Sequence, residues 1–163
     1  MKNSIFITVV GVVVATMIAA HAAYALTFFQ LKINKALSFF ILMTSMVPPV
    51  ALLVPLYMMG VKLHLYNTRI MLLLVYTAWR TPVLTWIIQG FFSKLPKEII
   101  EAGIIDGCSK GKSFYHLILP ISKPGIVSAA LLSAVYIWND YLVSSSFITA
   151  NEKKMISVGL YQY

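Results

Sequence analysis

The sequence predicts an all-α protein that crosses a membrane about four times, and three observations support this fold class. Of the 163 residues, 60% are hydrophobic and only 11% are charged, and the mean hydropathy is +0.83. Soluble domains carry about 25% charged residues, so lipid is the expected solvent for most of this chain. Four apolar segments each reach the roughly 20 residues that a membrane-spanning helix needs. One long polar interval, residues 93–123, separates the last two of them.

Charge and cysteine content exclude several functional classes. The net charge is +8, but the basic residues lie between apolar runs, which favours membrane flanks over a nucleic-acid surface. The only cysteine, Cys108, leaves no internal disulfide and no multi-cysteine metal site. His21, His64 and His116 are scattered without carboxylates or thiols at ligand spacing, so they are interpreted as incidental polar residues. No metal, no other cofactor and no nucleic-acid partner is therefore expected.

The first apolar segment covers residues 5–25 and has two interpretations. An apolar run followed by Ala20-His21-Ala22 is similar to a secretory signal with a cleavage site before or near Ala22. A membrane helix is favoured because the run is long for a signal peptide. The segment also ends at the aromatic pair Phe28-Phe29, with lysines just beyond, as membrane helices commonly do.

The second segment, residues 36–59, contains Pro48, Pro49 and Pro55. Proline removes a backbone donor and clashes with the preceding helical turn. Such a kink is tolerated in a membrane only where protein or water satisfies the freed carbonyls. We therefore expect this helix to be kinked, packed inside a bundle and next to a cavity.

The third and fourth segments, residues 70–92 and 125–148, carry the polar residues Arg80, Asn139 and Asp140. At 1.5 Å per residue, Arg80 and Asp140 lie about 15 Å and about 12 Å from the outer ends of their segments. Neither charge should face lipid, because each costs about 2.5–3.5 kcal/mol at a helix centre. We expect both to face the bundle interior, either as a pair or on opposite walls of a water-filled solute pathway. Purely structural polar contacts are the alternative.

Basic residues give a weak prediction of topology. If the loop at 93–123 is cytosolic, seven basic residues flank that side and five flank the other. Four crossings then place both ends of the chain outside, which is awkward for a first residue without its own signal. A further helix upstream of Met1 would remove this difficulty. The seven are Lys32, Lys35, Lys94, Lys97, Lys110, Lys112 and Lys123, and the five are Lys2, Lys62, Arg69, Lys153 and Lys154.

The polar loop is predicted to be a helix-turn-helix. Glu98 near the start of a first helix suits the positive end of its dipole, and Gly107 suits its C-terminal stop. Ser109 can cap a second helix that stops at Pro120. The alternative is a plain amphipathic connector on the membrane surface. A phosphate-binding loop at residues 107–113 is rejected, because the spacing is one residue short and no strand precedes it.

Residues in this loop resemble the EAA motif of bacterial ABC importer permeases. The motif is E-A-A, three residues, G, nine residues and I-x-L-P, and the spacing here fits, although Gly103 replaces the usual alanine and Leu117 the usual isoleucine. Further stretches, such as Pro55-Leu-Tyr57 and Trp138-Asn-Asp140, are similar to carbohydrate permeases of the maltose-transporter type. The residues that the resemblance assigns to ATPase docking are Glu101, Ala102, Gly103, Asp106, Gly107, Cys108, Leu119 and Pro120.

The resemblance implies a single type I ABC importer permease domain over residues 1–163, without the family's first and last helices. It implies a multi-pass protein of the bacterial inner membrane that has no catalytic groups of its own. Implied partners are a cytosolic ATP-binding subunit, a second permease subunit, an extracytoplasmic sugar-binding protein and membrane lipid. A permease for another solute, such as glycerol phosphate or amino acids, and a truncated non-transporting fragment remain alternatives. An intramembrane enzyme is disfavoured, since no nucleophile and base are found together.

Overall fold

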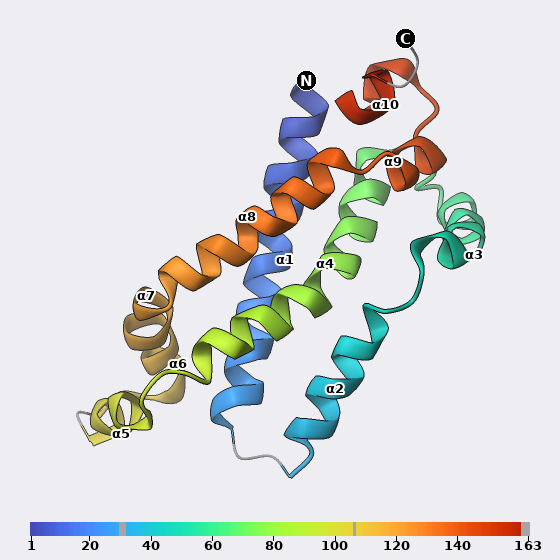
Figure 1. Cartoon of the computed structure of the whole chain (residues 1–163). Helices are drawn as coiled ribbons and strands as arrows, with labels where there is room; N and C mark the ends of the chain where they lie inside the picture. The colour runs from blue at the N-terminus through green and yellow to red at the C-terminus, as the bar shows by residue number, and fades with distance from the viewer. Residues whose placement is uncertain (30–31, 106, 161–163) are drawn as a thin grey trace.

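The computed structural model describes residues 1–29, 32–105 and 107–160, which contain helices and connecting turns but no strand (Figure 1). The start of α1 lies at the same end of the bundle as α10, and α5, α6 and α7 lie at the opposite end, here called the loop end (Figure 1). The elements are α1 (Lys2–Phe28), α2 (Asn34–Thr44), α3 (Pro49–Lys62), α4 (Arg69–Phe92), α5 (Lys97–Ile105), α6 (Lys110–Ser113), the π-helix η1 (Phe114–Ile118), α7 (Leu119–Ile121), α8 (Lys123–Asn139), α9 (Leu142–Phe147), the 3-10 helix η2 (Asn151–Lys153) and α10 (Ile156–Leu160).

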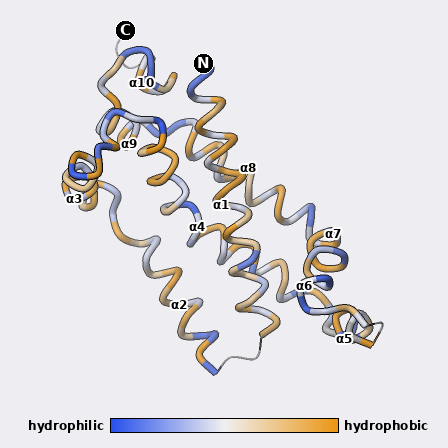
Figure 2. The backbone as a smooth tube through the Cα atoms, turned by 180° about the vertical axis from the view of Figure 1, so that it is seen from behind, coloured by the Kyte–Doolittle hydropathy of each residue, from blue (hydrophilic) through white to orange (hydrophobic). Residues whose placement is uncertain are grey.

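Two of the described helices, α1 and α4, are long and apolar enough to cross a membrane. They confirm the predicted segments at 5–25 and 70–92, with α1 extending a few residues further at each end. The number of candidate spans within the described residues rises to four if each of two sharply bent helix pairs is one span. Hydrophobic residues dominate the length of the bundle, and hydrophilic residues gather toward its two ends (Figure 2).

A stripe of small residues lets α1 lie directly against α4, which is its most extensive partner. Ser4, Thr8, Gly11, Ala15 and Ala19 are buried and recur every three or four residues, so they share one helix face. Around Gly11 the neighbouring helices lie at ordinary van der Waals distance from the position of a Cβ atom. A Cβ atom there would lie 3.6 Å from Ile137 of α8 and 4.0 Å from Tyr76 of α4. Small residues of this kind allow close van der Waals packing between helices in lipid.

The buried side chains form two clusters along this helix pair. The terminal-end cluster includes Ile7, Tyr76 and Phe147, which join α1 and α4 to α9. The loop-end cluster includes Phe92 of α4 together with Phe114 of the polar loop, so the loop is packed into the core of the helix bundle. The rest of the loop-end cluster comes from Ala15, Ala19, Ala20, Ala23, Tyr24, Leu84, Ile88, Ile118 and Ala129.

The predicted second segment, residues 36–59, is two helices rather than one kinked helix. α2 and α3 are bent by 83° relative to each other. Between them Pro48 is extended, with ψ at 130°, and Pro49 begins α3. A proline disfavours helical backbone at the residue before it, so Pro48 and Pro49 keep Val47 and Pro48 from continuing a helix between α2 and α3. Pro55, by contrast, lies inside α3 without ending it.

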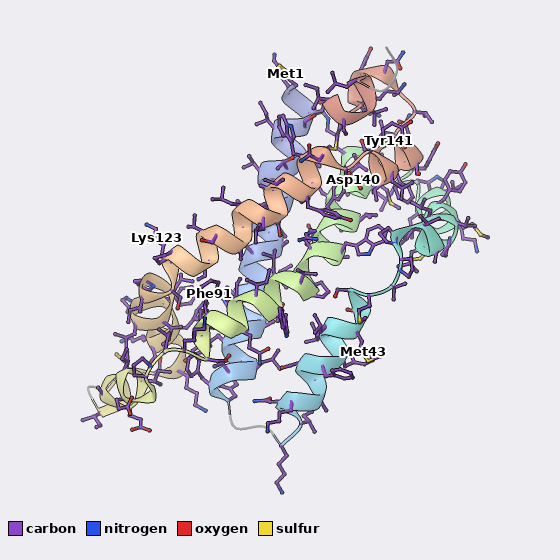
Figure 3. The ribbon with its side chains drawn as sticks, in the orientation of Figure 1. Met1, Met43, Phe91, Lys123, Asp140 and Tyr141 are labelled. Carbon is purple, nitrogen blue, oxygen red and sulfur yellow. The ribbon has the colours of Figure 1, made fainter. Side chains whose placement is uncertain are left out.

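The predicted fourth segment, residues 125–148, is correct only as far as Asn139. α8 has 17 residues, or about 26 Å of helix, and the chain then leaves the helix at Asp140, where ψ is 119°. The Asp140 carboxylate accepts the backbone N–H groups of Val143 and Ser144 at 2.9 and 3.3 Å. It thereby caps the short helix α9, and this local bond competes with continued helix. Figure 3 shows Asp140 and Tyr141 at the junction of α8 and α9.

Candidate functional site

The turn after α5 has the local structure that its sequence predicts. Gly107 has a φ of +80°, a left-handed conformation that favours glycine. The N–H of Cys108 donates to the carbonyl of Gly103 at 2.8 Å, which is the bond that closes a Schellman motif. The Ser109 hydroxyl then accepts the N–H of Lys112 at 3.3 Å, so the predicted cap of the second helix is confirmed. The result is a sharp reversal between α5, here called the first arm, and residues Lys110–Ile121, the second arm.

The two positions that depart from the family pattern contact each other across the arms. Gly103 is buried, and a Cβ atom on it would lie 2.5 Å from Cδ1 of Leu117. The absence of a side chain at Gly103 therefore makes the space that Leu117 occupies. We therefore expect the two departures to compensate for each other.

The first arm presents a mixed polar and apolar surface at the loop end. Glu101, Ala102 and Gly107 are exposed, as docking residues must be. Ile105 follows Glu101 by four residues and is 84% exposed, the largest exposure of any described large hydrophobic side chain. The sequence interpretation missed Ile105, although its spacing from Glu101 places the two on one helix face.

The remaining predicted docking residues differ in their surroundings. Cys108 is half-buried, and Pro120 is exposed on the second arm. Gly103 and Leu119 turn inward, where Leu119 packs against the loop-end cluster. These two shape the loop and do not form its outer surface. Asp106 lies outside the described residues.

The second arm continues past the point where the sequence predicted its end. Pro120 does not stop it, because α7 runs on to Ile121. The preceding segment is a π-helix, in which the Leu119 N–H bonds to the Phe114 carbonyl five residues back. This wider turn accommodates a proline ring that would clash with the preceding carbonyl of a regular α-helix. Phe114 and Ile118 on this arm are both buried in the loop-end cluster.

An aromatic clamp, formed by His21 and Tyr24 of α1 with Phe114 and Tyr115 of the second arm, fixes that arm to α1. His21 Nε2 lies 2.8 Å from the Tyr115 hydroxyl, and its Nδ1 lies 2.7 Å from the carbonyl of Met17. The His21 and Phe114 rings are 4.7 Å apart, and the Tyr24 and Phe114 rings 4.9 Å. His21 therefore makes a structural contact between α1 and the second arm that the sequence interpretation did not predict. A histidine inside an apolar helix was the available signal.

Two further contacts attach the start of the second arm to α1. The Tyr24 hydroxyl donates to the carbonyl of Lys110 at 2.9 Å, at the start of the second arm. The Lys110 ammonium lies 4.7 Å from the centre of the Phe29 ring at the end of α1, a cation–π distance. The second arm is thus held along its whole length, by polar bonds at the start and by buried apolar side chains further on.

The polar residues predicted for the membrane join α4 to α8 through two sets of contacts, one helical turn apart on α4. The Tyr76 hydroxyl donates to the Asp140 carboxylate at 2.9 Å. One turn along α4, Arg80 lies 3.3 Å from the Ser133 hydroxyl and 4.3 Å from the centre of the Tyr136 ring. Among the described residues, Arg80 and Asp140 form no ion pair with each other. The direct-pairing alternative is therefore not the arrangement in this structure.

Asn139 is the third residue predicted for the pathway. Its side chain is exposed and donates to the carbonyl of Val135 within α8, at 2.8 Å. Arg80 and Asp140 are half-buried. The three do not converge on one described site, although Arg80 and Asp140 contribute to the same α4–α8 junction.

Comparisons with known proteins agree with this geometry. A solved bacterial ABC transporter involved in the import of the acidic polysaccharide alginate superposes with a TM-score of 0.79 at 24% identity, and the match covers 98% of this chain and 55% of that one. The trehalose/maltose transport system permease protein MalG of Thermococcus litoralis is 34% identical, over 98% of this chain and 58% of its own. The melibiose/raffinose/stachyose import permease protein MelC of Bacillus subtilis is 31% identical, over 97% and 58%.

This chain spans little more than half the length of the curated relatives that it matches. Within that length the match is almost complete, because residues 5–162 fit the family described as binding-protein-dependent transport system inner membrane component. The resemblance found in the loop motif is thereby confirmed on the whole chain. The protein belongs to the family of binding-protein-dependent transport system inner membrane components.

Proposed function

We propose that this chain is a permease subunit of an ATP-driven sugar importer, and that the first arm docks a cytosolic ATP-binding subunit. The carrying observation is the shape of the loop. Its first arm ends in a closed turn and exposes Glu101, Ala102 and Ile105, whereas its second arm buries Phe114 and Ile118 in the loop-end cluster. A highly exposed isoleucine on the same helix face as a glutamate is typical of a protein interaction site. The other partners would be a second permease subunit and an extracytoplasmic sugar-binding protein.

The mechanism follows from how the two arms are attached. ATP binding would close the ATPase subunits and displace the first arm. The Gly103–Leu117 contact would pass this displacement to the second arm, and the aromatic clamp would pass it to α1. Because α1 packs along α4, both helices would move together and change which side of the membrane the cavity faces. No group of this chain takes part in the hydrolysis chemistry.

The proposed solute class is a sugar, because relatives at 31–34% identity are named for trehalose, maltose, melibiose, raffinose and stachyose. Along the pathway we assign contacts to Asn139, with Arg80 and Asp140 setting the junction behind it. Asn139 is exposed and offers an amide oxygen to a sugar hydroxyl. Tyr136, also exposed, offers an aromatic face one turn away.

Co-purification from bacterial membranes tests this proposal. The tagged full-length subunit should retain an ATP-binding subunit, and hydrolysis by the complex should rise when a sugar and its binding protein are added. Trehalose, melibiose, glycerol phosphate and an amino acid, supplied in parallel with their binding proteins, would identify the solute. Stimulation by one of the last two alone would contradict the sugar assignment. Failure to retain any ATPase would contradict docking.

Ile105→Asp should weaken retention of the ATP-binding subunit by roughly thirtyfold, the loss expected when a central apolar interface contact is removed. Quantitative co-purification measures this loss. Ile33→Asp is the matched control, since Ile33 is another exposed isoleucine at the loop end but lies beside α2. Equal retention by the two variants would show that Ile105 is not an interface residue.

Gly103→Ala should loosen the loop, because the new methyl group meets Leu117. Displacing that leucine costs about 0.5–1.5 kcal/mol if it leaves its preferred rotamer. Adding Leu117→Ile should recover much of this cost, so the two substitutions should be non-additive. The measurement is thermal unfolding of the purified complex for both single variants and the double variant. Simple additivity would mean that the two positions do not compensate.

Tyr115→Phe removes one hydrogen bond of the aromatic clamp and keeps the ring. ATPase retention should be unchanged, while the amount of solute transported per ATP should fall about fivefold, as a bond of about 1 kcal/mol allows. The control is His116→Ala on the same arm, whose imidazole bonds only to the carbonyl of Lys112 in its own helix among the described contacts. A similar fall in both variants would exclude a specific role for the clamp.

A further inference from the structure

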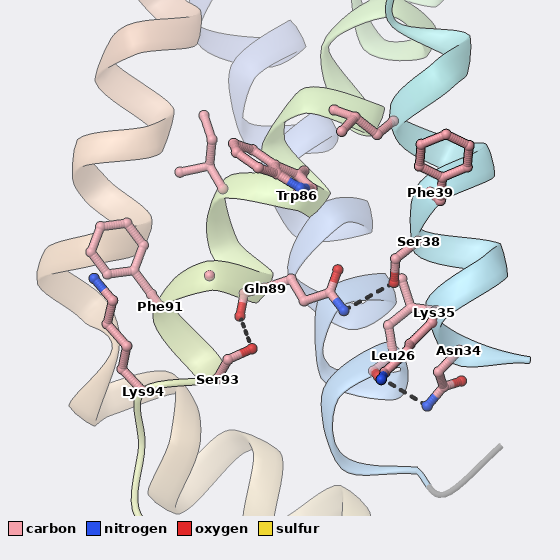
Figure 4. A pocket seen from close by; sticks show the side chains of 13 residues that line it. Leu26, Asn34, Lys35, Ser38, Phe39, Trp86, Gln89, Phe91, Ser93 and Lys94 are labelled. Carbon is pink, nitrogen blue, oxygen red and sulfur yellow. Dashed lines mark hydrogen bonds between the residues drawn. The ribbon is translucent and has the colours of Figure 1, made fainter. Parts of the chain in front are cut away.

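A pocket of about 630 Å³ opens between the loop-end halves of α2 and α4 (Figure 4). Trp86, Gly90 and Lys94 line its α4 side. Trp86 and Gly90 are four residues apart and so share one face of α4, and Lys94 follows in the turn after the helix. Lys35, Ser38 and Phe39 line the α2 side. None of the residues already assigned to docking or to the solute pathway lines this pocket.

The pocket is hollow because of one glycine and one hydrogen bond. A Cβ atom on Gly90 would have no neighbour within 4 Å, so the helix surface is open there. The Gln89 amide donates to the Ser38 hydroxyl at 3.0 Å and holds α2 at a fixed distance from α4 (Figure 4). Two aromatic walls face outward beside the hollow, with Trp86 54% and Phe39 64% exposed.

The charges at the pocket have one sign. Its ionisable lining residues are Lys35 and Lys94, and no carboxylate is among the described lining residues. Lys35 is the second residue of α2, and Lys94 follows the end of α4 by two residues. Trp86 lies eight residues from Lys94, or about 12 Å deeper along α4. An anionic group at the helix ends with a long apolar extension toward Trp86 would match this layout.

We propose that this pocket binds an anionic phospholipid, with its headgroup at the loop-end rim that Lys35 and Lys94 flank, Lys94 beside Phe91 and Lys35 on α2, and an acyl chain over Gly90 against Trp86 and Phe39. The proposal rests on the proposed function in one respect, since that function places the loop end in the cytosol. The cytosolic surface of the membrane is rich in anionic lipid, and basic pockets between membrane helices hold such headgroups. Exposed aromatic side chains occupy the same interfacial depth.

Native mass spectrometry of the full-length subunit, purified with its associated chains, tests this site. Dioleoyl phosphatidylglycerol should be retained and dioleoyl phosphatidylcholine should not. Lys35→Gln with Lys94→Gln should weaken phosphatidylglycerol retention by roughly twenty-five-fold, because each lysine near an anionic lipid contributes about fivefold. Lys123→Gln is the charge control, an exposed lysine at the same end but outside the pocket.

Gly90→Leu is a second variant that leaves both lysines in place. Its Cβ atom has no neighbour within 4 Å and its branches extend into the hollow, so the chain should fold normally and lose the lipid. Gly159→Leu, at an equally open position in α10, should retain it. An arm with inorganic phosphate alone separates a lipid site from a free-anion site. Binding of phosphate with the same affinity as the lipid would overturn the acyl-chain part of the proposal.

Equal retention of both lipids, or no loss in either pocket variant, would overturn the proposal completely. So would a Gly90→Leu variant that keeps the lipid and loses sugar transport, because the pocket would then belong to the solute pathway. The lipid-retention readouts do not require ATP hydrolysis. Loss of ATPase retention with lipid binding intact would count against the proposed function and leave the lipid site supported.

Discussion

The close approach of α1 to α4 is the constraint on which the rest of the structure depends. Lipid gives no hydrophobic drive for helices to associate, so their contact must come from van der Waals packing at short range. Along α1, the small side chains from Ser4 to Ala23 allow the two helices to pack at this short range. The resulting pair supports α8 near Gly11 at one end and the second arm of the loop at the other. A displacement of the loop would therefore be passed to the whole α1–α4 pair and not to a single helix.

Polar groups within the apolar bundle are joined where helices bend or meet. Asp140 ends α8, caps α9 and bonds to Tyr76, so one carboxylate fixes a break, a new helix and an interhelical contact. The Arg80 guanidinium donates to the Ser133 hydroxyl and lies over the Tyr136 ring, and both contacts lower the cost of burying its charge. Because these charged side chains link neighbouring helices, we expect the linked helices to move together.

Sequence reasoning predicted features whose causes are local. The long apolar runs of α1 and α4, the reversal at Gly107 and the cap at Ser109 depend on residues adjacent in the chain, and all are confirmed. What it missed depends on a partner far along the sequence. The roles of His21 and Leu117 required knowing that Tyr115 and Gly103 lie beside them. Likewise, hydropathy could not detect the end of α8, because the apolar run continues after Asp140.

The central claim is that the first arm meets an ATP-binding subunit, and one cysteine can test it directly. Cys108 is the only native cysteine, so Ile105→Cys combined with Cys108→Ser places a single thiol on the exposed face of α5. A short thiol-reactive cross-linker in bacterial membranes should join this subunit to the ATPase, with a yield that changes on adding ATP. Labelling of the same thiol in intact cells by a membrane-impermeant reagent would contradict the claim, because the first arm would then face outward.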